Sequence, residues 1–147
     1  ALEHQPNRPE IFNNLGVSYY LGGQYDQAVQ AFRDALRLGS TENKVYNNLG
    51  LALSAQGEHQ AAFEAFVKGS PRFTAYNNLG VVLLRAGYPG DAIACFERAI
   101  ESNPSYYAKA NENLRRARKA FVNHLSHNSQ REAPDSSCAS AFSASSR

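Results

Sequence analysis

Apolar residues recur along this chain at helical rather than strand spacing. The first such stripe, at i, i+3 and i+7, is formed by Phe12, Leu15 and Tyr19. The pair Gly22-Gly23 interrupts it, and a second apolar face follows and ends at Gly39-Ser40. The pattern predicts two consecutive helices joined by a short turn, with their apolar faces buried against each other.

The two-helix pattern returns twice more along the chain. An aromatic-Asn-Asn-Leu-Gly pentapeptide ends at Gly16, Gly50 and Gly80, and an alanine and a phenylalanine follow each glycine at the same offsets. Self-similarity at a period of 34 and then 30 residues is typical of helical repeat proteins. The recurring positions are Leu15, Gly16, Ala28 and Phe32; Leu49, Gly50, Ala62 and Phe66; and Leu79, Gly80, Ala92, Phe96 and Pro104.

The small residues in this pattern predict close helix packing. A glycine inside a helix costs about 1 kcal/mol relative to alanine, so three such glycines indicate that the helices touch there. We expect Gly16, Gly50 and Gly80 to lie where the two helices of each pair cross, with an alanine opposite. The three phenylalanines are expected to fill the space between neighbouring pairs.

The second unit and the two ends of the array depart from the pattern. The second unit lacks four residues, and Gly69 followed by Pro71 predicts a short second helix over 59–68. Residues 105–124 are expected to form a terminal capping helix with a polar outer face. Its predicted inward residues are Ala110, Leu114, Ala117 and Phe121. Residues 1–8 are interpreted as an N-terminal extension, and the Ser/Ala-rich residues 125–147 as a flexible tail.

Composition and charge narrow the classes of partner. Apolar residues make up 43 % of the 147 residues, which is enough for a core, and the net charge of +2 gives no drive towards nucleic acid. No apolar run approaches the roughly 20 residues that cross a bilayer, so no direct membrane insertion is expected. A basic cluster is interpreted as a solvated face rather than a phosphate, acidic-peptide or lipid site. It consists of Arg115, Arg116, Arg118 and Lys119.

The sequence shows no motif of a catalytic or metal-binding site. There is no glycine-rich phosphate loop and no nucleophile elbow, so we expect no catalytic residue, cofactor or metal. His124 and His127 share a helical face without a third ligand and are expected to be solvated. Cys95 is interpreted as a small apolar filler, and Cys138 as a tail thiol that nothing activates. The absence of methionine indicates a processed or excerpted chain.

The repeated residues resemble the tetratricopeptide repeat family. Aromatic-x-x-Leu-Gly-x-x-Tyr followed by Ala-x-x-x-Phe-x-x-Ala matches the family pattern over residues 9–42, 43–72 and 73–106. Ser40 replaces the closing proline of the first repeat, and Gly69 the last alanine of the second. The resemblance implies a right-handed α-solenoid of three repeats plus the cap, within residues 9–124. It also implies a non-catalytic protein-interaction scaffold. The Asn-Asn-Leu-Gly motif favours a bacterial member of the family.

The resemblance further implies that the first helix of each repeat lines a concave groove. The asparagines Asn13, Asn47 and Asn77 are expected to face the groove. A second row resembles the asparagine ladder of O-linked N-acetylglucosamine transferases and could equally bond between helices; it consists of Asn14, Asn48 and Asn78. The other implied groove residues are Val17, Tyr20, Leu51, Val81, Leu84 and Arg85.

The implied groove is mostly apolar, which suits an amphipathic helix or an extended apolar peptide. The family's two-carboxylate clamp for chaperone C-termini requires Lys and Asn or Arg where this chain has Asn13, Val17, Asn77 and Val81. No chaperone-tail binding through that clamp is expected. The alternatives are a lipoprotein-type assembly subunit of a bacterial pilus or secretion apparatus, self-associating through the solenoid ends, and the recognition arm of a glycosyltransferase-like enzyme. The expected compartment is the cytoplasm or the bacterial periplasm.

Overall fold

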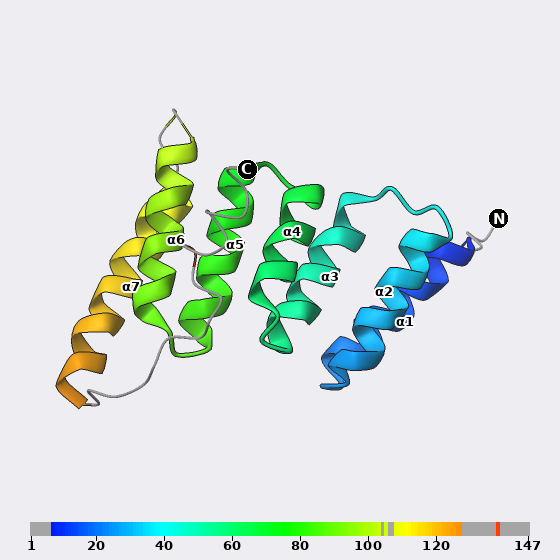
Figure 1. Cartoon of the computed structure of the whole chain (residues 1–147), viewed down its shortest axis with the longest axis horizontal. Coiled ribbons are helices and arrows are strands. Elements are labelled where there is room, and N and C mark those ends of the chain that lie inside the picture. The colour runs from blue at the N-terminus through cyan, green and yellow to red at the C-terminus, as the bar shows by residue number, and fades with distance from the viewer. Residues whose placement is uncertain (1–6, 104, 106–107, 128–137, 139–147) are drawn as a thin grey trace, which may run out of the picture.

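The chain folds as a row of helices. The computed structural model describes residues 7–103, 105, 108–127 and 138, and within these ranges every regular element is a helix. The helices lie side by side in chain order, with α1 and α2 at one end and α7 at the other (Figure 1). They are α1 (Arg8–Leu21), α2 (Tyr25–Arg37), α3 (Asn43–Ala55), α4 (His59–Gly69), α5 (Arg72–Arg85), α6 (Pro89–Ser102) and α7 (Ala108–His127).

Glycines set the turns within the helix pairs. Gly23, Gly57 and Gly87 follow α1, α3 and α5 and have φ angles of 76°, 83° and 90°. This left-handed conformation is accessible to glycine at little steric cost, whereas a Cβ would strain it. Each first helix therefore reverses into its second helix through the same kind of tight turn. The structure thus contains the three predicted pairs, α1–α2, α3–α4 and α5–α6, followed by α7.

The helices of each pair touch through a glycine and a phenylalanine. A Cβ built on Gly16, Gly50 or Gly80 would lie 2.6, 2.5 or 2.6 Å from the ring of Phe32, Phe66 or Phe96, respectively. Each ring therefore rests on the glycine of its own repeat, and all three rings are buried. The expectation that these rings fill the space between pairs is wrong in this respect, because the missing side chain leaves room for a ring within the pair. The matching alanines Ala28, Ala62 and Ala92 are fully buried.

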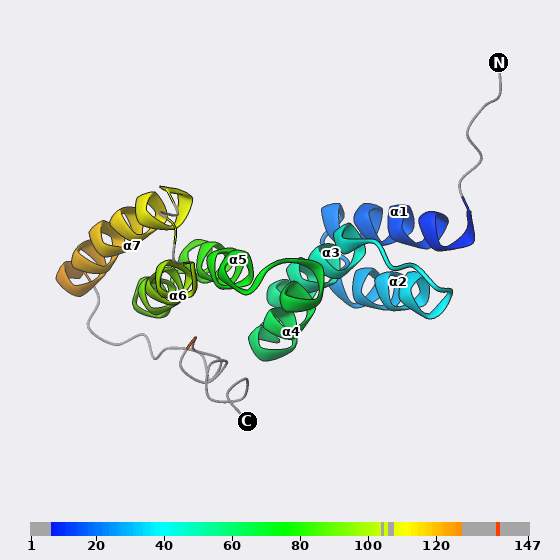
Figure 2. The ribbon, with the colours of Figure 1, turned by 90° about the horizontal axis from the view of Figure 1, so that it is seen from above.

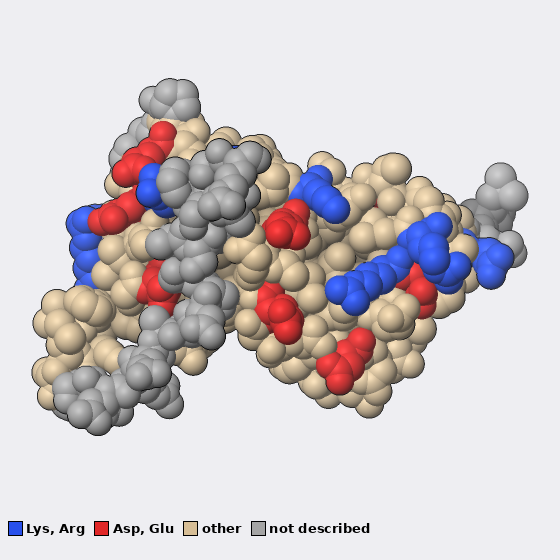
Figure 3. All heavy atoms as spheres, viewed as in Figure 1, with Lys and Arg blue, Asp and Glu red and all other residues tan. Residues whose placement is uncertain are grey.

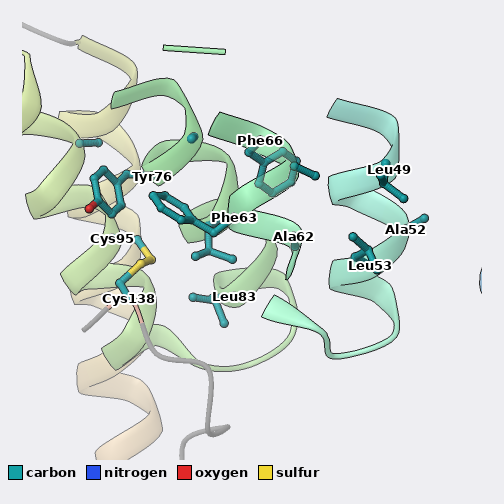
Figure 4. Close-up of a cluster of buried hydrophobic side chains, with 14 of the residues drawn as sticks. Leu49, Ala52, Leu53, Ala62, Phe63, Phe66, Tyr76, Leu83, Cys95 and Cys138 are labelled. Atoms are coloured by element: carbon teal, nitrogen blue, oxygen red, sulfur yellow. A yellow bond between two sulfur atoms is a disulfide. The ribbon is translucent and has the colours of Figure 1, made fainter. Parts of the chain in front are cut away.

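The core continues from one pair to the next. The second helix of each pair packs on the first helix of the following pair, as α2 does on α3 and α4 on α5. At the α4–α5 junction the rings of Phe63 and Tyr76 lie 4.7 Å apart (Figure 4). On α3, α5 and α7, which each pack on the second helix of the preceding pair, the equivalent leucines are buried: Leu49, Leu79 and Leu114. The array therefore has one continuous core, as expected for a solenoid.

Leu15 does not share the burial of its equivalents. Its side chain is 40 % exposed, although the 3.6-residue period placed it in a buried stripe. The reason is topological, since no helix precedes α1 among the described residues to cover this side of it. The prediction that Leu15 is a core position is therefore wrong.

The short second helix of repeat two is present and ends one residue beyond the predicted range of 59–68. Helix α4 has 11 residues, against 13 in α2 and 14 in α6, and it ends at Gly69 before Pro71. A Cβ built on Gly69 would lie 2.7 Å from the backbone oxygen of Asn43, at the start of α3. The two ends approach so closely that the alanine typical of this position does not fit.

Helix α7 caps the array but extends beyond the predicted bounds of 105–124, ending at His127. Its residues Ala110, Leu114 and Ala117 are buried as expected, whereas Phe121 is 36 % exposed. The prediction for Phe121 is therefore only partly correct. Its ring lies near Gly90 at the start of α6, and this contact leaves part of the side chain exposed. Residues 1–6, Pro104, 106–107, 128–137 and 139–147 lie outside the described residues, and so do the predictions made for them.

The two cysteines are paired, which corrects the interpretation of Cys95 as a filler and of Cys138 as an unengaged thiol. They form a disulfide with their Cα atoms 5.3 Å apart, and both side chains are fully buried (Figure 4). The bond ties residue 138 to helix α6 across 43 residues of sequence. Two cysteines so far apart carry no pairing signal in the sequence, so only the tertiary structure reveals this contact.

Candidate peptide-binding surface

The first helices of the repeats form a concave side. Seen from above, α1, α3, α5 and α7 lie on one side of the row and α2, α4 and α6 on the other (Figure 2). Helices α1 and α7 stand forward at the two ends, so the side formed by the first helices curves inward between them. Each first helix also touches the next one directly. Residues at equivalent positions of these helices therefore form rows that run from one first helix to the next.

One row of equivalent residues on the first helices, which the family pattern assigns to this side, is apolar. Val17, Leu51 and Val81 each follow the packing glycine of their repeat, and all three are only partly buried while touching the core. Tyr20 and Leu84 are partly buried on the same helices, and Arg85 is exposed. At α7 the row ends in Arg116, which forms a 2.7 Å ion pair with Glu112. The first helices thus carry a row of apolar side chains that ends in a charged residue at α7.

The first row of asparagines does not line the groove. Asn13 is 4 % exposed and accepts a 3.2 Å hydrogen bond from Asn48 Nδ2, and Asn77 is 7 % exposed and accepts a 2.9 Å bond from Asn113 Nδ2. These amides join neighbouring first helices, because a buried amide needs a partner and the next repeat offers one. The prediction that Asn13 and Asn77 contact a peptide is therefore wrong.

The third member of this row makes different contacts. Asn47 donates to the backbone oxygen of Gly69 at 3.4 Å and accepts a 2.9 Å bond from the Ser70 hydroxyl. Its side chain therefore closes the C-terminal end of the short helix α4 instead of joining repeats two and three. Asn78, which would be its partner by repeat symmetry, is partly exposed and has no hydrogen-bond partner within the described part of the chain.

The second row of asparagines is the more accessible one. Asn14 is exposed, while Asn48 and Asn78 are partly exposed. Of these, Asn48 uses one of its two amide N–H groups on Asn13. Asn14 and Asn78 make no side-chain hydrogen bond among the residues that the structure describes, so all donors and acceptors of these two amides can serve a ligand.

Charged side chains are scattered over the opposite side. Viewed from the side of α2, α4 and α6, basic and acidic side chains are interspersed (Figure 3). The predicted basic cluster of α7 is partly neutralised as well, because Arg116 pairs with Glu112 and Arg118 with Glu97 at 3.4 Å. These contacts agree with its interpretation as a solvated face.

The groups with shifted pKa values include the buried His59 and the partly buried Asp91. His59 is 4 % exposed at the start of α4; burial lowers its pKa, while the carboxylates of Asp91 and Glu58 act in the opposite direction. Burial also raises the pKa of Asp91. Within the described ranges no group of three or more His, Cys, Asp or Glu side chains could hold a metal ion. No helix in those ranges is both long and apolar enough to span a membrane.

Antiparallel helix pairs stacked in tandem, with one inward-curving side, define an α-solenoid scaffold. The chain belongs to the tetratricopeptide repeat family, whose models match residues 9–41, 44–68 and 73–106, together more than half of its length. Domains of this family generally serve as protein-interaction modules without catalysis of their own.

A relative with the same type of repeat supports the assignment to this family. The chain is 36 % identical over 69 residues to the small glutamine-rich tetratricopeptide repeat-containing protein 2 of Mycosarcoma maydis, covering 47 % of this chain and 20 % of that protein. The match thus spans about a fifth of the length of that relative.

Solved structures show the same fold. The Sgt2 repeat domain of Aspergillus fumigatus aligns with a TM-score of 0.56 and 18 % identity, covering 88 % of this chain and 89 % of that domain. The first repeat domain of Spaghetti (RPAP3), bound to the HSP90 peptide SRMEEVD, aligns with a TM-score of 0.54 and 18 % identity, covering 78 % and 96 %.

Proposed function

We propose that this chain is a non-catalytic scaffold whose concave side binds a peptide or an amphipathic helix of a partner protein. The observation that carries the proposal is the row of partly exposed apolar side chains Val17, Leu51 and Val81 on three neighbouring first helices. Removing partly exposed apolar side chains from water lowers the free energy of the system, so a ligand that covers them is bound more tightly. The binding of the HSP90 peptide by the RPAP3 domain supports the choice of a peptide as ligand.

The amides beside this row define how the ligand is held. Asn14 and Asn78 can each donate to and accept from the backbone of an extended peptide, without reading its side chains. Val17, Leu51 and Val81 would then contact apolar side chains of the ligand. Recognition is therefore assigned to the apolar pattern of the ligand, and orientation to the two amides. The roles as an assembly subunit or as the arm of a glycosyltransferase-like enzyme stay hypotheses.

Replacing Leu51 and Val81 together by aspartate is expected to weaken peptide binding by about 100-fold or more, because two charges would enter the apolar row. Random 12-residue peptides are first selected on the unaltered protein by display, and the affinity of the recovered sequences is then measured by fluorescence anisotropy. Val122→Asp on the exposed side of α7 is the matched control and should leave binding unchanged.

The proposal fails if the recovered peptides bind the Leu51→Asp/Val81→Asp variant as tightly as the parent while circular dichroism shows both to be folded. The single variant Val17→Asp supplies a second test should the double variant unfold. Chemical-shift changes confined to α2, α4 and α6 on adding the peptide would contradict the assignment to the concave side.

The HSP90 peptide SRMEEVD is expected not to bind this groove. At the clamp positions this chain has buried neutral Asn13 and Asn77 and the apolar Val17 and Val81, so no cation pairs with the terminal carboxylates. Placing carboxylates there without partners is unfavourable. Isothermal titration calorimetry with SRMEEVD should show no saturable heat, and an RPAP3 repeat domain provides the positive control. Saturable binding that Val81→Asp abolishes would overturn this prediction.

A further inference from the structure

One side of α1 is exposed, although its equivalents in the other first helices are covered. Ile11 is 49 % exposed, whereas the equivalent Val45, Ala75 and Ala110 are 1 %, 0 % and 0 % exposed. Leu15 is 40 % exposed, whereas Leu49, Leu79 and Leu114 are 8 %, 0 % and 7 % exposed. Ser18 continues the same side one turn further on and is exposed too. We call Arg8, Ile11, Leu15 and Ser18 the leading face.

The other repeats show what covers such a face. At each internal junction it is the second helix of the preceding repeat, with α2 packing on α3, α4 on α5 and α6 on α7. At the last junction Glu97 of α6 also reaches Arg118 of α7, at 3.4 Å. The covering element is therefore an amphipathic helix of one recurring type in all three cases. The leading face presents large aliphatic side chains at the positions that these helices cover.

We propose that the leading face binds an acidic amphipathic helix of a separate protein, in the manner in which α6 packs on α7. Arg8 supports the acidic character, because it stands three residues before Ile11 on the same side of α1. It is exposed and has no ion-pair partner among the residues that the structure describes. A carboxylate on the incoming helix pairs with it, and the aliphatic side chains of that helix cover Ile11 and Leu15.

A second copy of this chain is a poorer occupant than a separate acidic helix. The opposite end of the array is α7, which is a first-type helix and exposes Arg115 and Lys119. Stacking this end on the leading face would bring these cations towards Arg8, and like charges repel. The one carboxylate described on α7, Glu112, is already paired with Arg116. The leading face is also separate from the concave row, since Val17 lies two residues from Leu15 and thus on a different side of α1.

The test uses a helix that this chain itself provides. A fluorescein-labelled peptide with the sequence of residues 89–102 and Cys95→Ser is added to the full chain, and anisotropy measures its binding. This sequence carries Asp91, Glu97 and Glu101 against Arg98. Saturable binding is expected, with a gain of helicity by circular dichroism, because so short a helix is marginal in water until it packs.

Variants of the chain locate the site. Leu15→Asp and, separately, Ile11→Asp are expected to weaken binding by about tenfold or more, and Arg8→Glu to reduce its salt dependence. Both apolar side chains are half-exposed, so the variants should fold. Leu21→Asp, at the 79 % exposed end of α1, is the matched control and should bind normally. Leu51→Asp should also bind normally, which separates this proposal from the concave groove.

A control peptide tests the helix type. Replacing Ile93 and Ile100 of the peptide by aspartate should abolish binding, because these aliphatic residues are the ones that α6 carries beside its core. The proposal is overturned if the parent peptide does not saturate at about 1 mM, or if Leu15→Asp and Ile11→Asp leave its affinity unchanged. It is equally overturned if sedimentation velocity shows self-association of the chain that Leu15→Asp abolishes, since a second copy would then occupy the face.

Discussion

Gly50→Ala is expected to lower the free energy of unfolding by about 1–3 kcal/mol, which is a large share of the 5–15 kcal/mol typical of a domain. The added Cβ would lie 2.5 Å from two carbons of the Phe66 ring, closer than such atoms approach in proteins. The ring is 1 % exposed within the core, so either the ring or the helix must move to accept the Cβ. Urea unfolding followed by circular dichroism measures the change.

Two further variants separate the steric effect from helix propensity. Gly90→Ala also replaces a helical glycine, but its Cβ would lie 3.4 Å from Phe121, so it is expected to be neutral or stabilising by up to about 1 kcal/mol. Adding Phe66→Leu to Gly50→Ala should cost less than the sum of the two single changes, because a smaller side chain leaves room for the Cβ. Additive losses would show that ring and glycine do not compete for the same space.

Gly69→Ala is expected to be destabilising by about 1–3 kcal/mol, even though alanine is the residue typical of this family position. Its Cβ would lie 2.7 Å from the backbone oxygen of Asn43 and 3.0 Å from Oδ1 of Asn47. The nearest atom belongs to the backbone, which cannot rotate away as a side chain can. The start of α3 must therefore shift, and the 3.4 Å bond from Asn47 to the Gly69 oxygen is lost. Urea unfolding gives the magnitude.

Gly22→Ala is the matched control for this change. Gly22 also stands at a helix end, but its φ of −82° suits any residue and a Cβ there would lie 3.5 Å from the nearest atoms. It is expected to change stability by less than about 0.5 kcal/mol. A Gly69→Ala protein as stable as the parent would show that the two helix ends are not in tight contact, contrary to the explanation given for the short helix α4.

The asparagine rows show where prediction from sequence reaches its limit. The pentapeptide places Asn13, Asn47 and Asn77 at one position of each first helix, and nothing local distinguishes them. Asn13 and Asn77 nevertheless bond to the next first helix, whereas Asn47 bonds to the end of α4. The difference arises because α4 is short and ends beside α3, so a second helix supplies the partner that the neighbouring repeat supplies elsewhere. The choice of partner is thus a property of the junction and not of the repeat.

The 34-residue and 30-residue spacings, the glycine turns and the 3.6-residue apolar stripes determined the helix pairs, their order and the short helix α4, because these depend on residues close in sequence. The tertiary structure alone decided that Phe66 rests on Gly50, that Leu15 is exposed, and that Cys95 pairs with Cys138. The physical reason is that periodicity assigns a residue to a side of its helix, whereas burial and bonding depend on which other helix, if any, lies against that side.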